Sequence, residues 1–187
     1  MTETRLHPRP PVELLRSTHL HRGPVFDVVR DHVRLPSGRE QKIDVVRHGG
    51  AVAIAARRPT GELVLVRQYR HAVGDWLLEL PAGRLEPGEA PLCAARRELE
   101  EETGLVAERW SELTRFFAAP GFCSEELVVF LAEGLRPAGT GRREPDADEE
   151  IELEERTPAQ ILAGAARDAK TLLAAALLLG AAPDPVG

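Results

Sequence analysis

Three glutamates, Glu98, Glu101 and Glu102, stand at positions i, i+3 and i+4 of a short charged segment. If this segment is an α-helix, the spacing places all three side chains on one face. Like charges at this spacing destabilise a helix by roughly 0.2–0.5 kcal/mol per pair, so the face favours a bound cation. Carboxylate oxygens are ligands that suit hard ions such as Mg²⁺ or Mn²⁺.

Arg97 stands beside Glu98 and one helical turn before Glu101. Its guanidinium can orient a glutamate through a charge-assisted hydrogen bond. The alternative reading of this segment is a solvated acidic helix face with no ligand, which is what acidic runs usually are.

The helix that carries these side chains is predicted from about Glu89 to Gly104. Pro91 suits a first helical turn, and Gly104 suits a C-terminal stop. Apolar or small residues recur at helical spacing, which indicates a buried face: Leu92, Ala95, Leu99 and Thr103. Cys93 is expected to be a small core residue of the same helix.

The rest of the chain predicts a mixture of short strands and helices. Strands are expected at residues 51–56, 62–66, 77–80, 114–118, 127–133 and 151–153, the first two as a hairpin. One helix is expected from Thr157 to about Ala166, and a last helix is expected from a cap at Asp168 to Gly180. Because strands and helices do not alternate regularly, the pattern indicates an α+β fold or a mixed-sheet sandwich.

The residues from Val12 to Val46 predict a small antiparallel sheet with a turn at 36–38. This sheet has few apolar residues and would be marginal alone, so it must pack against the main domain or a partner subunit. We therefore divide the chain into an N-terminal β-sheet segment, residues 1–48, and a main domain, residues 49–187.

Composition excludes several classes of protein. The chain has 187 residues, of which 43% are hydrophobic. Its net charge of -6 argues against a nucleic-acid binder, which would usually carry a basic face. The near-apolar run Leu172 to Ala182 is too short to span a bilayer, which needs about 20 residues. Two cysteines, without metal or redox spacing, and an N-terminus without a long apolar core favour a reducing compartment. We expect a cytoplasmic protein with no membrane partner.

The constrained positions around the three glutamates resemble the signature of the Nudix hydrolase family. They are Gly83, Glu89, Arg97-Glu98-Leu99, Glu101-Glu102 and Gly104-Leu105. This 23-residue resemblance implies an α/β/α sandwich with a mixed sheet between helices. It also implies a hydrolase that attacks the pyrophosphate of a nucleoside diphosphate derivative with water and a divalent metal ion.

The resemblance also implies roles for single residues. Glu98, Glu101 and Glu102 would be metal ligands, with the carbonyl of Ala82 as an extra ligand. Gly83 would allow a close approach of the backbone, and Arg97 would orient a carboxylate. For Glu89, a metal role and a structural role at the helix start stay open.

Two further segments resemble the ADP-ribose pyrophosphatase branch of this family. One runs from Arg-Gln-Tyr-Arg at 67–70 to Leu-Glu-Leu-Pro-Ala-Gly at 78–83, and the other is Ala-Pro-Gly at 119–121. Arg70 would then contact a phosphate, and Pro120 would mark the branch. Arg47 would approach the adenine or its ribose. Trp76 and Phe122 are alternatives for a base or ribose pocket, but their large apolar area favours the core.

The acidic loop at 146–155 resembles the segment that supplies the catalytic base in similar enzymes. Ala147 stands where a glutamate is expected, so Glu149 is the candidate base or metal ligand, with Asp148 and Glu150 as substitutes. The alternative is that these acids form only a solvated loop.

The function implied is Mg²⁺- or Mn²⁺-dependent hydrolysis of ADP-ribose to AMP and ribose 5-phosphate, by a homodimer whose N-terminal sheets form the interface. A nucleotide sugar or a dinucleotide is the alternative substrate. A nucleotide-sensing module without catalysis is the alternative of a different class, although its carboxylate helix would be expected to lose a glutamate.

Overall fold

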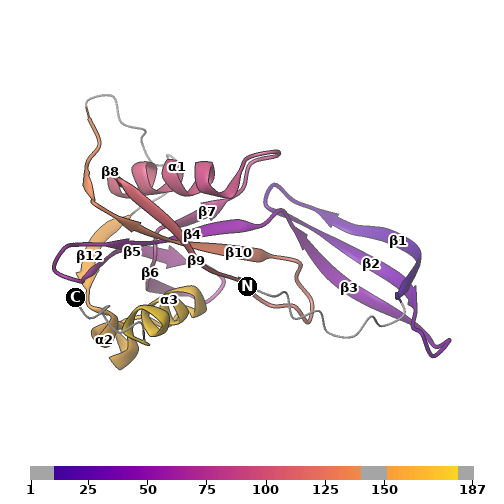
Figure 1. The fold of residues 1–187 in the computed structure, drawn as a ribbon. Coiled ribbons are helices and arrows are strands. Elements are labelled where there is room, and N and C mark those ends of the chain that lie inside the picture. Colours follow the sequence, from indigo (N-terminus) through magenta and orange to yellow (C-terminus); the bar gives the residue numbers. More distant parts are fainter. Residues whose placement is uncertain (1–10, 140–150, 181–187) are drawn as a thin grey trace, which may run out of the picture. The chain divides into compact units, whose positions relative to one another are not determined.

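The structure is a computed structural model that describes residues 11–139 and 151–180. The chain separates into two compact units (Figure 1). The first contains the residues up to His48 together with Ala119–Glu125, and the second contains Gly49–Ala118 and the residues from Glu126 onward. No helix among the described residues is long and apolar enough to cross a membrane.

The first unit is a three-stranded antiparallel sheet in the order β1-β2-β3. Its strands are β1 (Glu13–Arg22), β2 (Phe26–Arg34) and β3 (Glu40–His48). Val29, Val33 and Asp31 are buried, whereas nearly every residue of β1 is exposed. The loop at 119–125 joins this sheet, because the backbone of Val46 hydrogen-bonds to Phe122 and Ser124 at 2.7 and 3.0 Å.

The second unit is built on a mixed seven-stranded sheet in the order β12-β5-β4-β10-β9, with β6 beside β5 and β7 beside β4. Its strands are β4 (Ala51–Arg57), β5 (Leu63–Arg70), β6 (Asp75–Glu79), β7 (Ala82–Arg84), β9 (Arg109–Phe117), β10 (Glu126–Glu133) and β12 (Glu152–Arg156). Strands β4 and β10 are parallel, and the other pairs are antiparallel. A small ladder joins β8 (Leu105–Val106) to β11 (Arg136–Pro137).

Helices cover both faces of this sheet (Figure 1), as the alternation along β4 requires. Ala51, Ala53 and Ala55 pack in one core with Ala174 and Ala175 of α3 (Ala169–Gly180). The intervening residues of β4 pack in a second core with α1 (Pro91–Thr103): Val52, Ile54 and Ala56 against Ala94, Ala95 and Leu99. The predicted α+β fold with α/β/α layers is confirmed.

Several element boundaries differ from the sequence prediction. Strand β9 begins at Arg109, five residues before the predicted strand. The predicted helix from Thr157 to Ala166 is only the short α2 (Pro158–Gln160), followed by a π-helical turn, Ile161–Ala165. Gly164 has a φ of 110° in that turn, a conformation that ends regular helix. The last helix agrees, and the Asp168 side chain accepts a hydrogen bond from the Thr171 backbone N–H at its start.

Candidate active site

Helix α1 sets the orientation of the three predicted metal ligands. It begins at Pro91 and ends at Thr103, and Gly104 caps it with a left-handed φ of 67°, which agrees with the predicted stop at this glycine. Burial of Ala95 and Leu99 turns one face of the helix into the core. Glu102 is also buried, with 6% of the residue exposed, and its carboxylate accepts a hydrogen bond from the Ala82 backbone N–H at 3.0 Å. This contact ties the last turn of α1 to β7.

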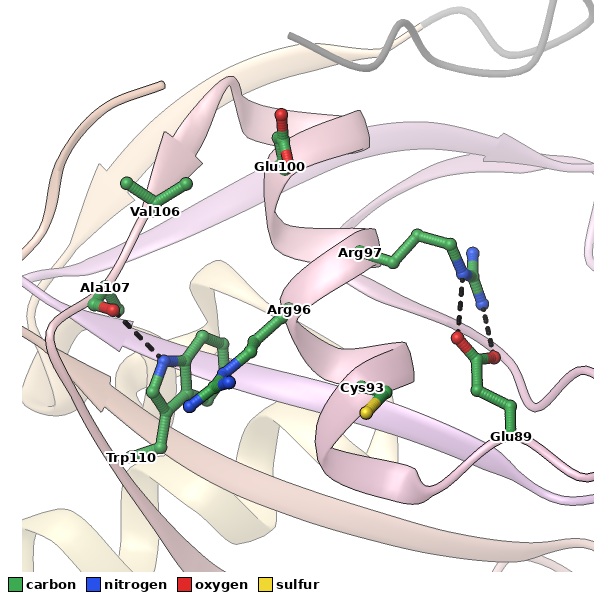
Figure 2. Close-up of a pocket in the computed structure, with 8 residues that line it drawn as sticks. All are labelled: Glu89, Cys93, Arg96, Arg97, Glu100, Val106, Ala107 and Trp110. Carbon is green, nitrogen blue, oxygen red and sulfur yellow. Dashed lines mark hydrogen bonds and ion pairs between the residues drawn. The ribbon is translucent and has the colours of Figure 1, made fainter. Parts of the chain in front are cut away.

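Arg97 binds the neighbouring carboxylates together. Its Nη1 donates to Glu98 at 2.6 Å and to Glu101 at 3.0 Å. Its Nε and Nη2 donate to the two carboxylate oxygens of Glu89 at 3.1 and 3.0 Å (Figure 2). The hydrogen bonds that Arg97 donates to Glu89, then to Glu98 and Glu101, raise the pKa of Arg97 against the effect of burial. The Glu89 carboxylate holds Arg97, and both roles left open for Glu89, at the metal and at the helix start, stay predictions.

Gly83 lies where the backbone of β7 passes the Glu98 side chain. A Cβ at this position would overlap the Glu98 carboxylate. The glycine is therefore required by close approach, since its own backbone is not in the left-handed region. Pairing of Gly83 with Val52 of β4 fixes this strand beside the helix.

The donor chemistry of this face fits a hard divalent cation. The carboxylates of Glu98 and Glu101 both accept hydrogen bonds from the same nitrogen of Arg97, at 2.6 and 3.0 Å. Two carboxylates that share one positively charged partner lie close enough together to share a cation. Within residues 11–139 and 151–180, acids, histidines and cysteines form no preassembled group of three that holds a metal. An ion here would draw on oxygens that Arg97 now holds close together.

Arg70 lies at the end of β5 and belongs to a charged cluster in the second unit. Its Nε and Nη2 donate to the two oxygens of Glu79 at 2.8 and 2.9 Å. Lys170 of α3 also donates to Glu79, and it donates to Asp168 at 2.9 Å. Hydrogen bonding to Glu79 raises the pKa of Arg70, and the charge of Glu102 contributes. Arg70 and Glu102 therefore interact electrostatically.

The sequence analysis did not single out Glu79, the buried carboxylate that holds Arg70. Its side chain is only 3% exposed. Burial alone would raise the pKa of Glu79, but the bonds from Arg70 and the charge of Lys170 lower it to about 2. The sequence did contain a signal for this residue, because Glu79 is a single acid inside the apolar Leu-Glu-Leu-Pro run. An acid in such a run is expected to be buried, and a buried charge needs a partner.

The other two predicted substrate residues belong to the first unit. Arg47 of β3 donates to the buried Asp31 at 2.5 Å, and Ser17 donates to the same carboxylate at 2.6 Å. Pro120 is exposed in the loop that pairs with β3. The structure thus brings the Pro120 loop beside the strand of Arg47, two segments that are 73 residues apart in the chain.

Three predictions about burial are wrong. Trp76 and Phe122 are not core residues, because 43% and 59% of their surfaces are exposed. Cys93 is exposed, because it lies on the side of α1 opposite the buried Ala95 and Leu99. Glu149, with Ala147 and its neighbours, lies outside the described residues.

Comparison with known proteins agrees with this architecture. Residues 47–176 match the model of the NUDIX domain, so the chain belongs to the Nudix family. It is 43% identical over 135 residues to the ADP-ribose pyrophosphatase of Bacillus subtilis (strain 168), an alignment that spans 72% of each chain. It is 48% identical over 128 residues to the ADP-ribose pyrophosphatase of Mycobacterium tuberculosis. That alignment spans 68% of this chain but 62% of the relative, less than two thirds of its length.

A solved structure, titled as the crystal structure of an ADP compounds hydrolase, has the same fold. The match has a TM-score of 0.78 at 22% identity and covers 91% of this chain and 93% of the other. Membership of the Nudix family implies a divalent metal ion, and the carboxylate face of α1 offers the oxygens to hold one.

Replacing Glu79 by glutamine is expected to destabilise the fold in a pH-dependent way. The pKa is lowered in the folded state from 4.5 to about 2, so the ionised Glu79 stabilises the fold fully above pH 4.5. This contribution, ~3 kcal/mol, is lost as the pH falls from about 4.5 through 2. Urea unfolding at a series of pH values should show that wild type exceeds Glu79→Gln near neutrality and that the difference shrinks in acid.

The matched control is Glu112→Gln, which breaks an exposed ion pair with Arg115 and should change stability little at any pH. A difference between wild type and Glu79→Gln that does not depend on pH would contradict the assignment.

Replacing Gly83 by alanine should weaken divalent-cation binding while the chain stays folded. The added Cβ displaces the Glu98 carboxylate, which is the flexible end of a side chain, rather than the backbone. We expect a loss of affinity of about 10–100-fold, the range seen when groups that orient metal ligands are disturbed. Electron paramagnetic resonance with Mn²⁺ as the probe measures it. Gly180→Ala is the control, since a Cβ there meets nothing within 4 Å, and equal affinity in the two variants would refute the role of Gly83.

Proposed function

We propose that this protein is a divalent-metal-dependent pyrophosphohydrolase that splits ADP-ribose into AMP and ribose 5-phosphate. The single observation that carries this proposal is the Arg97 cluster, in which one guanidinium holds Glu89, Glu98 and Glu101 beside the Glu102–Ala82 contact. The two ADP-ribose pyrophosphatases that it resembles support the substrate.

The charge of the reactants supports the metal requirement. The protein carries a net charge of -6 and must bind an anionic diphosphate, so cations are needed between them. Glu98, Glu101, Glu102 and the carbonyl of Ala82 would hold Mg²⁺ or Mn²⁺. An ion held there would supply charge to neutralise phosphate oxygens and to lower the pKa of the attacking water. The oxygen of that water bonds to one phosphorus, and the bridging P–O bond breaks.

The protein's own residues bind and orient the substrate. Arg97 keeps the carboxylates in place against their mutual repulsion. Arg70 uses two of its five N–H groups on Glu79, which leaves the Nη1 edge to contact a phosphate. Arg47 approaches the adenine or its ribose, and Pro120 belongs to the same substrate-binding surface. Glu149 serves as the base that receives the proton of the water, or as a further metal ligand.

We also infer a cytoplasmic homodimer that forms through the N-terminal β-sheet segment, residues 1–48, with residues 49–187 as the Nudix hydrolase domain. Large apolar side chains that are 43–55% exposed in the first unit support a second copy of this chain as the partner. They are Val12, Leu14, Leu20, Val25 and Phe26. A monomer would leave this apolar surface in water.

Product analysis tests the reaction. The purified protein with Mg²⁺ should release AMP and ribose 5-phosphate from ADP-ribose, and more slowly cleave NADH, a sugar nucleotide or a diadenosine polyphosphate. Glu101→Gln and Glu102→Gln should each lower kcat by at least about 100-fold, because losing a ligand costs more than losing an orienting group. Glu112→Gln on β9 should keep the wild-type rate.

A preference for another compound would change the substrate and keep the hydrolase. Full activity in either glutamine variant would exclude that residue as a metal ligand. Binding of ADP-ribose without cleavage would favour the sensing module.

The dimer is tested by mass. Light scattering on a size-exclusion column should give twice the 20.5 kDa of the chain. The double variant Leu14→Lys with Leu20→Lys should give a monomer, because it places charge on the exposed apolar surface. Arg16→Lys on the same strand is the control and should stay dimeric. A monomeric wild type at micromolar concentration would overturn this part of the proposal.

A further inference from the structure

A pocket of about 490 Å³ opens beside α1 in the second unit, on a side of the helix next to the carboxylate face. Figure 2 shows its lining. The helix contributes Cys93, Arg96, Arg97 and Glu100, and the chain beyond the helix contributes Val106, Ala107 and Trp110. Its size lies within the range of about 300–1,000 Å³ that is usual for small-molecule sites. The hydrolysis proposed above does not use it.

Trp110 gives this pocket a fixed aromatic wall. The indole Nε1–H donates to the carbonyl of Ala107 at 3.2 Å, so the polar edge of the ring is satisfied by the backbone. The ring also meets Phe130 edge-on, with centroids 6.4 Å apart, and packs at the border of the core. A ring held in this way can stack on a flat ligand without losing further conformational freedom.

Arg96 gives the pocket a cation. Its side chain is exposed, lies on the side of α1 that faces Trp110 (Figure 2), and makes no ion pair or hydrogen bond with any residue in the described ranges. The other charged groups of the lining are engaged or directed elsewhere. Arg97 donates two hydrogen bonds to Glu89, and Glu100 lies one turn further along the helix.

We propose that this pocket is a second ligand site, which binds a planar aromatic ring carrying an anionic group, the chemistry of a nucleoside monophosphate. The ring stacks on Trp110 between Val106 and Ala107, and the anionic group pairs with Arg96, whose planar fork suits phosphate. The proposed hydrolysis of ADP-ribose would supply such a ligand, because AMP is its product. The origin of the ligand therefore rests on the proposed function, whereas the pocket and its chemistry do not.

The site is distinct from the carboxylate face, although the two share Arg97. The Nη1 of Arg97 binds Glu98 and Glu101, whereas its Nε and Nη2 bind Glu89, which lines the pocket. An anion in the pocket needs no metal ion, because Arg96 provides the charge. Binding can therefore be measured without metal and without turnover.

The exposed thiol of Cys93 reports occupancy directly, since it lies in the pocket lining (Figure 2). The full chain with Cys123→Ser keeps Cys93 as its single cysteine. It is treated with N-ethylmaleimide in EDTA, and the mass of the product is followed over time. AMP at about ten times its Kd should slow alkylation about tenfold, because a tenth of the sites stay open. Adenosine, which lacks the anion, and ribose 5-phosphate, which lacks the aromatic base, should protect much less at the same concentration.

Arg96→Gln should abolish protection by AMP, whereas the control Arg39→Gln, at an exposed arginine of the first unit, should keep it. Alkylation that AMP does not slow at millimolar concentration would overturn the proposal, and so would full protection in Arg96→Gln. Equal protection by ribose 5-phosphate would overturn the assignment of an aromatic ligand. None of these measurements involves hydrolysis, so the alkylation result can be interpreted even if the protein does not hydrolyse ADP-ribose.

Discussion

The structure around the site depends on one guanidinium that holds several carboxylates together. Repulsion between glutamates at helical spacing costs only a few tenths of a kcal/mol per pair, but it would turn free side chains apart. Each charge-assisted bond from Arg97 contributes about 1.5–3 kcal/mol, so the cluster is stable before any cation binds. The 15% exposure of Arg97 limits competition from water. The arrangement keeps these carboxylates close together through the hydrogen bonds of Arg97.

The rest of the second unit positions this cluster from two sides. Strand β4 separates two cores, so that α1 packs on one face and α3 on the other. From the α3 side, the Thr171 hydroxyl accepts a hydrogen bond from the Leu80 N–H at 2.8 Å, and Lys170 binds Glu79. From the α1 side, Glu102 binds the Ala82 N–H. The short segment from Glu79 to Gly83 therefore connects the anchored Arg70 to the carboxylate face.

Much of this could be predicted where the pattern is local. The spacing of the glutamates, together with Pro91 and Gly104, predicted α1, and continuous apolar runs predicted β4 and β10. The prediction was wrong where tertiary contacts decide. Cys93 was predicted to be a core residue, but it lies on a different side of α1 from the buried Leu99 and is exposed. Gly164 interrupts the predicted helix in the π-helical turn after α2, through a backbone conformation that composition does not reveal.

Burial of charge was the least visible property in the sequence. Glu79 reads as one acid among many, and its partner Lys170 follows 91 residues later. Removing only one partner of such a buried pair leaves a charge without compensation, at a cost of about 3–5 kcal/mol. The same reasoning separates Arg70 from Arg96. Arg70 is anchored by a buried carboxylate and presents one edge in a fixed direction. Arg96 has no such anchor among the residues that the structure describes, which leaves it available to an incoming anion in the proposed site. Two arginines that look alike in the sequence thus have different capacities, and the difference lies in the carboxylate behind one of them.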